Sequence, residues 1–479
     1  LFFIRPRRFG KSIFLSMLRT YYDISQKEKF QKRFGNLWIG SQPTPLQGTF
    51  QILFLDFSRI GGIDGTLAQN FDDYCCGGLD DFASIYEPYY YPGFALEMKQ
   101  LEGSTNKLNF LDRKARNNGS HLYLIIDEYD NFTNVVLNEQ GNEIYHALTH
   151  ASGFYREIFK KFKGMFERIF MTGVSPVTMD DLTSGFNIGT NYSLSPEFNE
   201  MTGFNEEEVR AMLDYYATTC QFHHSTNELI EAMKPWYDNY CFSEKSYGGT
   251  TMYNSNMVLY FVDNYIRNGG YMPRNMVEEN IRVDYNKLRM LIRKDKEFAH
   301  DASTIQTLVQ QGYVTGELKT GFPAETVAEP DNFTSLLFYF GMLTISGTLE
   351  GETKLTIPNQ VVREQLYSYL LDTYNEADLR FDNWEKGKLA SAMAYRGDWK
   401  AYFDYIAECL HRYSSQRDKQ KGEAYVHGFT LAMTAQNRFY RPISEQENQE
   451  GYADIFMFPL LDIYKAVSYT HLRAHETKA

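Results

Sequence analysis

Four short runs of apolar residues mark the first part of the chain. Each has the length and continuity of a buried strand: Leu1 to Ile4, Gln51 to Phe57, Leu122 to Ile126 and Arg168 to Thr172. The stretch from Ile13 to Tyr22, by contrast, has apolar residues at helical spacing. A continuous apolar run is typical of a parallel strand buried on both faces. The pattern therefore predicts an α/β domain built on a parallel sheet.

The predicted first helix begins with a Gly-Lys-Ser sequence. A phosphate-binding loop typically lies between a strand and a helix and ends in Gly-Lys-Ser, as this segment does. The N–H groups at the helix N-terminus attract anions such as phosphate. Lys11 would reach the β- and γ-phosphates, and Ser12 would hold Mg²⁺. The usual pattern is G-x-x-x-x-G-K-[ST], and Arg5 occupies the place of its first glycine. The alternative is a surface helix that begins with Gly-Lys-Ser by chance. The candidate contacts to a nucleotide are Arg7, Arg8, Phe9, Gly10, Lys11 and Ser12.

Acidic and polar residues end two of the predicted strands. Asp127 and Glu128 follow one apolar run, and Thr172 ends the next. Open α/β sheets bind ligands at the carboxyl ends of their strands. We expect Asp127 to hold Mg²⁺ through water, Glu128 to polarise the attacking water, and Thr172 to sense the γ-phosphate. The alternatives are a strand-end acid that caps the next helix and a threonine bonded to local backbone.

Composition narrows the class of protein. A length of 479 residues predicts two or three domains. The net charge of −13 argues against broad nonspecific binding of nucleic acid, although a local basic groove is compatible with it. The five cysteines form no C-x-x-C pair, which disfavours a zinc site and fits a reducing cytoplasm. The longest apolar stretch, Phe333 to Ile345, is too short to span a membrane.

Motifs spread over nearly the whole chain resemble those of one family. The sequence also predicts an amphipathic helix over Phe204 to Tyr216, with acids in its first turn. Eight segments, one of them at the start of this helix, carry the resemblance: PRRFGKS, YLIIDEYDN, FMTGVSP, TGFNEEEV, WYDNYCF, YNSNMVL, LLFYFGMLTI and IPNQVVREQ. They are similar to segments of the AAA-ATPase-like proteins abundant in Bacteroidetes and other anaerobic bacteria. The resemblance implies ATP and Mg²⁺ as cofactors and leaves a homo-oligomer open. It also implies sheet elements before PRRFGKS, so we expect this chain to be truncated and the outer edge of its first strand to lack support.

The same resemblance implies a nuclease-like C-terminal part. A PD-(D/E)XK nuclease has a helical glutamate near Tyr and His, then a strand acid, then Glu-x-Lys on the next strand. Glu423, Tyr425, His427 and Asp454 fall on the first two elements. The resemblance thus implies Mg²⁺ at Glu423 and Asp454 and DNA as the substrate. No Glu-x-Lys in an apolar setting follows, so we expect an incomplete, inactive nuclease site.

The predicted order of domains follows from these segments. Residues 1–217 form a P-loop domain of AAA-ATPase type, and 218–376 form a mostly helical region that ends in a hairpin and resembles a winged unit. Residues 377–465 form an incomplete α/β domain of restriction-endonuclease type. Residues 466–479 are expected to be a non-native tail.

Three functions remain open from the sequence. The leading one is an ATP-binding, ATP-hydrolysing protein coupled to a degenerate nuclease-like module. The second is a non-catalytic interaction protein or scaffold with a nucleotide-binding fold. The third, an active Mg²⁺-dependent DNA endonuclease, requires the missing Glu-x-Lys.

Overall fold

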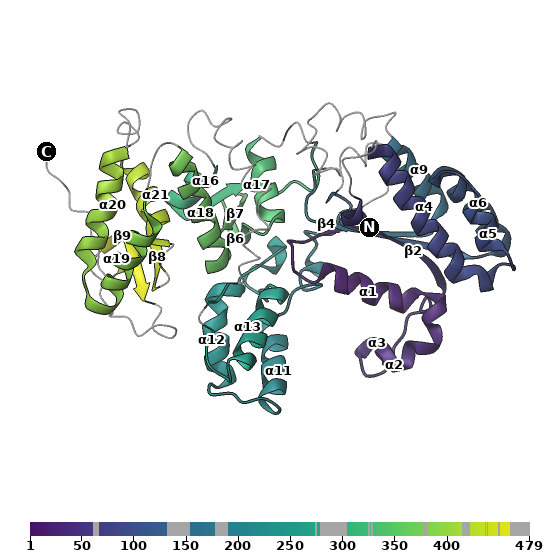
Figure 1. Cartoon of the computed structure of the whole chain (residues 1–479), viewed down its shortest axis with the longest axis horizontal. Helices are drawn as coiled ribbons and strands as arrows, with labels where there is room; N and C mark the ends of the chain where they lie inside the picture. The colour runs from purple at the N-terminus through teal and green to yellow at the C-terminus, as the bar shows by residue number, and fades with distance from the viewer. Residues whose placement is uncertain are drawn as a thin grey trace. The chain divides into compact units, whose positions relative to one another are not determined.

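The computed structural model divides the chain into two compact units (Figure 1). The first unit comprises Leu1–Thr202 and Lys319–Val327, and the second comprises Gly203–Leu318 and Ala328–Ala479. The structure describes residues 1–60, 67–131, 154–177, 190–273, 275–277, 304–323, 326, 329–376, 381–413, 422–435, 437, 439–448 and 451–459.

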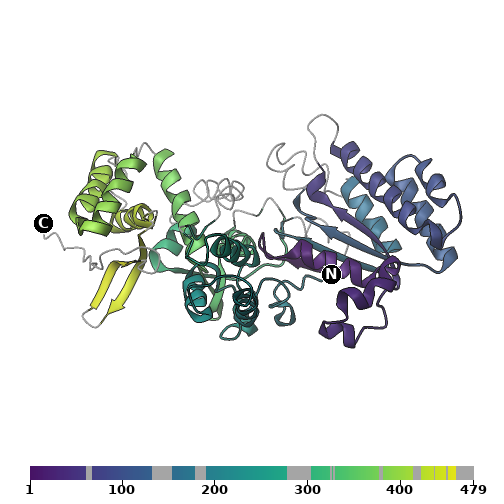
Figure 2. The ribbon, with the colours of Figure 1, turned by 60° about the horizontal axis from the view of Figure 1, so that its bottom comes forward.

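The first unit is built on a four-stranded parallel sheet (Figure 2). Its strands stand in the order β1-β4-β3-β2. Their bounds are Phe2–Ile4 for β1, Phe50–Asp56 for β2, His121–Asp127 for β3 and Arg168–Gly173 for β4. All four predicted strands are present within a residue or two, and the predicted parallel α/β sheet is confirmed.

Helices cover both faces of this sheet (Figure 2). On one face, Leu15 of α1 packs with Ile52 of β2 in a buried cluster. On the other face, Leu55 of β2 lies so close to Gly78 of α4 that a Cβ at Gly78 would come within 2.8 Å of it. Alternate residues of β2 thus face opposite layers, as expected in a strand. The helices of this unit are α1 (Lys11–Tyr22), η1 (Ile24–Lys29), α2 (Phe30–Phe34), α3 (Trp38–Ser41), η2 (Phe57–Arg59), α4 (Leu67–Tyr86), η3 (Glu87–Tyr89), α5 (Phe94–Lys99), α6 (Ser104–Asn118), α9 (Phe154–Met165) and η4 (Pro196–Phe198).

The outer edge of β1 is covered by residues 190–193. The Phe2 N–H donates to the Thr190 carbonyl at 3.0 Å, and the Tyr192 N–H donates to the Phe2 carbonyl at 3.1 Å. The Ile4 N–H donates to Ser193 Oγ at 2.7 Å. The expectation that this edge lacks support is therefore wrong, because a later segment of the chain folds back beside it.

The outer edge of β2 is shielded by two tyrosines of α4. Tyr86 Oη accepts the Ile52 N–H at 2.9 Å, and Tyr74 Oη accepts the Asp56 N–H at 2.8 Å. Unpaired N–H groups on an edge strand invite pairing with another chain. Hydroxyl acceptors at these two positions reduce that risk.

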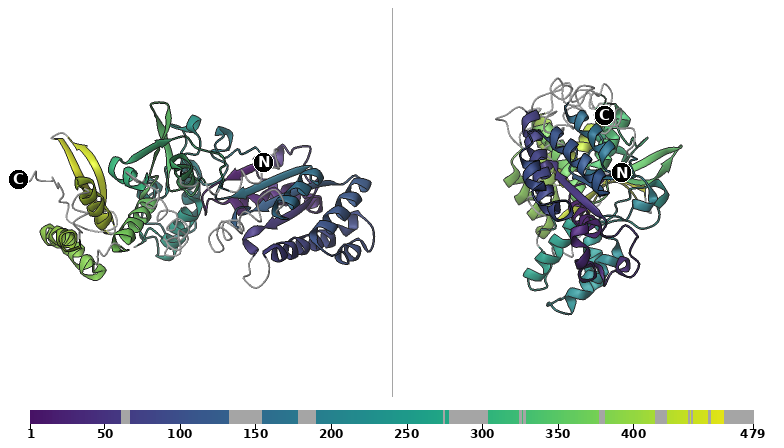
Figure 3. Two further views of the ribbon diagram at one scale, coloured as in Figure 1. Left: turned by 90° about the horizontal axis from the view of Figure 1, so that it is seen from above. Right: turned by 90° about the vertical axis from the view of Figure 1, so that its right-hand side faces the viewer.

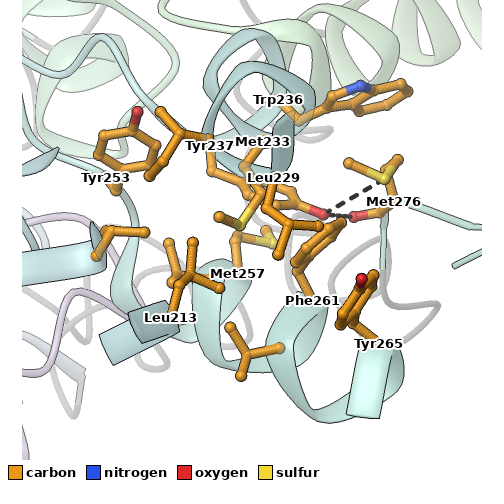
Figure 4. Close-up of a cluster of buried hydrophobic side chains, with 14 of the residues drawn as sticks. Leu213, Leu229, Met233, Trp236, Tyr237, Tyr253, Met257, Phe261, Tyr265 and Met276 are labelled. Atoms are coloured by element: carbon orange, nitrogen blue, oxygen red, sulfur yellow. Dashed lines mark hydrogen bonds between the residues drawn. The ribbon is translucent and has the colours of Figure 1, made fainter. Parts of the chain in front are cut away.

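The second unit begins with three helices around a shared core (Figure 4). Leu213 of α11, Met233 of α12 and Phe261 of α13 are fully buried there. The bounds are Glu206–Ala217 for α11, Thr226–Tyr237 for α12 and Ser255–Arg267 for α13, and η5 (Glu244–Ser246) follows α12. The helix predicted over Phe204 to Tyr216 is α11, which begins after the N-cap Asn205 in a capping box. The domain limit at residue 217 stays a prediction, and α11 packs with the second unit.

A three-stranded antiparallel sheet follows, in the order β5-β7-β6. It consists of β5 (Tyr313–Gly316), β6 (Thr344–Leu349) and β7 (Glu352–Thr356). Strands β6 and β7 confirm the hairpin predicted from the alternation around Gly347 and Gly351, both of which have positive φ. Three helices flank the strands in sequence: α16 (Thr304–Gln311), α17 (Pro330–Tyr339) and α18 (Gln360–Glu376). The resemblance to a winged unit stays a prediction.

The C-terminal part combines helices with one hairpin (Figure 3). The helices are α19 (Asn383–Arg396), α20 (Trp399–Tyr413) and α21 (Gly422–Ala435), and the strands are β8 (Tyr440–Asn448) and β9 (Gly451–Pro459). Strands β8 and β9 pair antiparallel. Within the described residues, no helix is both long enough and apolar enough to cross a lipid bilayer.

Candidate functional site

The carboxylate of Asp127, at the end of β3, accepts hydrogen bonds from the start of α1 and from the end of β4. Because β4 lies between β1 and β3, the carboxyl ends of all three are neighbours. Ser12 Oγ, at the start of α1, donates to Asp127 Oδ2 at 2.7 Å. Thr172 Oγ1, at the end of β4, donates to Asp127 Oδ1 at 2.6 Å. The structure thus brings together three of the residues that the sequence singled out.

The start of α1 presents N–H groups at this place. Gly10 is the N-cap, with φ 85°, a left-handed conformation that glycine adopts without steric cost. The first helical hydrogen bond runs from the Phe14 N–H to the Gly10 carbonyl at 3.0 Å. The N–H groups of residues 11–13 precede it and have no partner within the helix. Because the N-cap has no side chain, they suit an anionic ligand.

Lys11 lies buried beneath the loop. Its Nζ donates to the carbonyls of Arg5 at 3.0 Å and Pro6 at 3.1 Å, and only 5% of the side chain is exposed. Its Nζ is 4.0 Å from Glu128 Oε1. Burial lowers the pKa of Lys11, while the carboxylates of Glu128 and Asp127 act in the opposite direction. The ammonium is therefore held by the loop and faces the acids of β3.

Glu128 has an unusual backbone conformation. Its φ is 51°, which is rare for a residue other than glycine, and its N–H donates to Asp127 Oδ1 at 3.0 Å. Such strain is often kept at functional sites. Burial raises the pKa of Glu128, and the ammonium of Lys11 acts against it. A carboxylate with a raised pKa suits a general base near neutral pH.

Arg7, Arg8 and Phe9 complete the loop. Phe9 is fully buried, whereas the two arginines are partly exposed. Arg8 has φ 66°, so this loop holds a second residue in the left-handed region. The positive charge of Arg7 acts to lower the pKa of both Lys11 and Glu128. The loop thus leaves its two arginine side chains partly exposed to solvent and buries its phenylalanine.

Sequence reasoning treated Arg5 only as a departure from the usual glycine. In the structure, Arg5 is 1% exposed. Its guanidinium donates to the carbonyls of Ile4, Ser193 and Phe198 at 3.0, 2.7 and 2.7 Å. It therefore joins the start of the loop to the segment that covers the edge of β1. Nothing in the local sequence indicates that this arginine is buried.

Tyr129 and Asp130 were also missed as site residues. Asp130 Oδ1 accepts the Val174 N–H at 3.1 Å, and Oδ2 accepts the Ser175 N–H at 2.8 Å. The Tyr129 N–H donates to the Thr172 carbonyl at 3.0 Å. Both residues follow the predicted acids in the DEYD sequence, but the spacing alone does not distinguish them from surface residues of a loop.

The hard oxygen groups around Asp127 fit Mg²⁺. Ser12 and Asp127 offer a hydroxyl and a carboxylate, and Glu128 lies beside them. No cluster of three or more His, Cys, Asp or Glu side chains suited to a metal occurs in the part of the chain that the structure describes, here or at any other place. A magnesium ion here would therefore complete its coordination with water and phosphate oxygens.

The predicted nuclease residues can be placed only by element. Glu423 and Tyr425 lie in α21, and Asp454 lies in β9. The side chains of all three fall outside the described residues, as does the tail 466–479. His427 is half-buried in α21. The predicted two-acid site therefore stays a prediction.

Comparison with known families bears on the first unit. Residues 1–183 match the AAA-ATPase-like family model, described as Predicted AAA-ATPase. These residues, here called the AAA-ATPase-like region, include the loop, Asp127, Glu128 and Thr172. No curated protein matches the chain. The match ends before α21 and therefore does not extend to the predicted nuclease residues.

Proposed function

We propose that the AAA-ATPase-like region binds ATP with Mg²⁺ and hydrolyses it to ADP and phosphate. The contact of Ser12 Oγ with Asp127 Oδ2 at 2.7 Å is the observation that carries this proposal. It joins a helix N-terminus and a strand-end acid that lie 115 positions apart in the sequence. The family match over residues 1–183 supports the same class of ligand.

Each residue takes a role that suits its place. The N–H groups at the start of α1 and the ammonium of Lys11 would bind the phosphates. Ser12 directly and Asp127 through water would hold Mg²⁺, which neutralises phosphate charge when it is bound. Thr172 would sense the γ-phosphate, and its hydrogen bond to Asp127 Oδ1 supports this role.

Glu128 is the proposed general base. It would take a proton from the water that attacks the γ-phosphorus, while the bond to the β-phosphate oxygen breaks. Its burial and its contact with Lys11 support this assignment. The ammonium of Lys11 would stabilise the carboxylate until the proton transfers.

We further propose that the C-terminal helices and the β8–β9 hairpin form an incomplete nuclease-like module that does not cleave DNA. The order of α21, β8 and β9 is compatible with this assignment. The proposal depends on the sequence resemblance, and Glu423 and Asp454 are its two acids.

Fluorescent ATP titrated against three proteins tests the nucleotide site. Lys11→Ala should weaken binding about tenfold or more, because it removes the cation that pairs with the phosphates. Lys32→Ala, which removes an exposed lysine of α2, is the control and should bind as the wild type does. Equal affinity of wild type and Lys11→Ala would contradict the proposal.

Turnover tests the role of Glu128 separately. Glu128→Gln should bind ATP normally and lose about 10²-fold or more in kcat, since it removes a general base and keeps the shape. Wild-type turnover in that variant would make Glu128 structural. If the wild type itself binds ATP without hydrolysing it, the interaction-protein alternative replaces the enzyme.

A further inference from the structure

The turn after β4, residues Gly173–Ser175, is held by the two residues that follow the predicted catalytic acids. Asp130 accepts hydrogen bonds from the N–H groups of Val174 and Ser175, one on each carboxylate oxygen, at 3.1 and 2.8 Å. Tyr129 Oη donates to the Ser175 carbonyl at 2.6 Å. Asp130 is 1% exposed. The turn is thus tied to the end of β3 by bonds on both sides.

Gly173 shows how closely these parts fit. A Cβ at this position would lie 2.4 Å from Asp130 Oδ1 and 2.6 Å from the Tyr129 ring. Such distances leave no room for any other residue. The Arg5 N–H donates to the Gly173 carbonyl at 3.4 Å, so the turn also contacts the start of the phosphate-binding loop.

Asp130 is chemically matched to its two partners. An ionised carboxylate has acceptors on both oxygens, and charge-assisted bonds to N–H groups are stronger than neutral ones. An asparagine of the same shape would have one oxygen acceptor and would turn an NH₂ donor toward the other N–H. The pair of bonds therefore depends on the carboxylate itself.

The turn directly follows Thr172. The Thr172 carbonyl accepts the Tyr129 N–H, and its hydroxyl donates to Asp127 Oδ1. We infer that Asp130 is a positioning residue that holds the turn after β4, and through it the Thr172 hydroxyl, in place beside Asp127. This inference rests on the proposed ATPase function. Because the N–H groups that Asp130 accepts belong to the turn after β4, beside Thr172, its loss should lower turnover more than nucleotide affinity.

Asp130→Asn tests the inference in the full chain. We expect its affinity for fluorescent ATP to stay within about threefold of the wild type and its kcat to fall about tenfold or more. Hydrogen exchange of the Val174 and Ser175 amides should become faster in the same variant. Tyr129→Phe removes only the hydroxyl bond to Ser175, so it should show a smaller effect of the same kind. If Asp130→Asn does not fold, the kcat and the ATP affinity of Tyr129→Phe test the inference instead.

Asp72→Asn is the matched control. Asp72 Oδ1 accepts the Ser104 N–H at 3.0 Å at the start of α6, so the control makes the same carboxylate-to-amide change at another carboxylate bonded to the backbone of the same unit. Its kcat should equal that of the wild type. An equal loss of kcat in Asp72→Asn and Asp130→Asn would overturn the inference, because general destabilisation would explain both.

The inference and the proposed function can fail separately. Wild-type kcat in Asp130→Asn, with Lys11→Ala defective in binding, overturns the inference and leaves the proposed function intact. A wild type that binds no ATP overturns the proposed function and the inference with it.

Discussion

Arg5 illustrates how one buried side chain can join a strand end to a segment that is distant in the sequence. Its guanidinium connects the end of β1 to the carbonyls of Ser193 and Phe198. It also lies 4.4 Å from the centroid of the Phe3 ring, where a cation–π contact adds to the hydrogen bonds. The departure from the usual loop glycine is therefore a structural feature of this loop.

Restoring the usual glycine at this position should harm the protein. Arg5→Gly removes this donor from three carbonyls, two of them in buried hydrogen bonds, and hydrogen bonds to charged groups are worth about 1.5–3 kcal/mol each. We expect the affinity for fluorescent ATP to fall about tenfold or more and the thermal midpoint to drop. Arg5→Lys, which keeps the charge and loses the branched donor, should be intermediate. A glycine variant that binds ATP as well as the wild type would refute this role.

At the scale of elements, the position of a strand in the sheet decides which side chains meet. Strand β4 is adjacent to β1 and β3, although it comes last of the four in the sequence. Thr172 therefore reaches Asp127, while Asp56, at the end of edge strand β2, bonds to Ser58 and Arg59 instead. Two acids at strand ends thus have different surroundings because of strand order.

Helix α19 carries a buried lysine, Lys386, whose contribution to the free energy of unfolding depends on pH. Lys386 is 5% exposed and lies 5.1 Å from the centroid of the Phe381 ring. Burial lowers the pKa of Lys386 to about 8. Since the ordinary value is 10.5, the unfolded chain binds more protons between these values, and stability should rise as the pH rises from about 8 to about 10.5.

Lys386→Met should remove this dependence. The variant should unfold at a higher temperature than the wild type at pH 7, and the difference should shrink by pH 10. A pKa shift of this size corresponds to roughly 3 kcal/mol. Lys388→Met, which removes a half-exposed lysine paired with Glu385, is the control and should leave the pH dependence as in the wild type. Parallel pH profiles for wild type and Lys386→Met would contradict the assignment.

At the scale of the whole molecule, the candidate nucleotide site lies within the first unit, and the two proposed nuclease acids lie in the second. The first holds a converged set of hydroxyl, carboxylate and ammonium groups and matches a family of predicted ATPases. In the second, Glu423 lies in α21 and Asp454 in β9, and these are the two acids of the proposed nuclease-like module. A pair of acids binds Mg²⁺ weakly, because the ion keeps its water unless several oxygen ligands are preorganised.

We therefore expect no Mg²⁺-dependent cleavage of plasmid DNA by this chain. Loss of a group that positions the nucleophile or stabilises charge commonly costs about 10²-fold in rate. An apolar strand that carries Glu-x-Lys, added after Lys465, should restore cleavage. Cleavage by the present chain that Asp454→Ala abolishes would show that the site is already complete.

The elements of the fold were predictable where local patterns are strong. Leu122 to Ile126 is continuous and apolar because β3 is buried on both faces. The helix over Phe204 to Tyr216 was predictable because it is amphipathic and its first turn is acidic. The candidate site was predictable in its residue types, since Gly-Lys-Ser and Asp-Glu follow strands at places where ligands bind.

The sequence by itself determined the strands, the first helix and the chemical character of the loop, because these depend on neighbouring residues. Only the tertiary structure decided that Arg5 is buried, that residues 190–193 cover β1 and that Asp130 holds the turn after β4. These features join segments far apart in the sequence, such as Arg5 and Ser193, which are separated by 188 positions. Strand order brings such segments together, and no local pattern of apolar and polar residues encodes which of them meet.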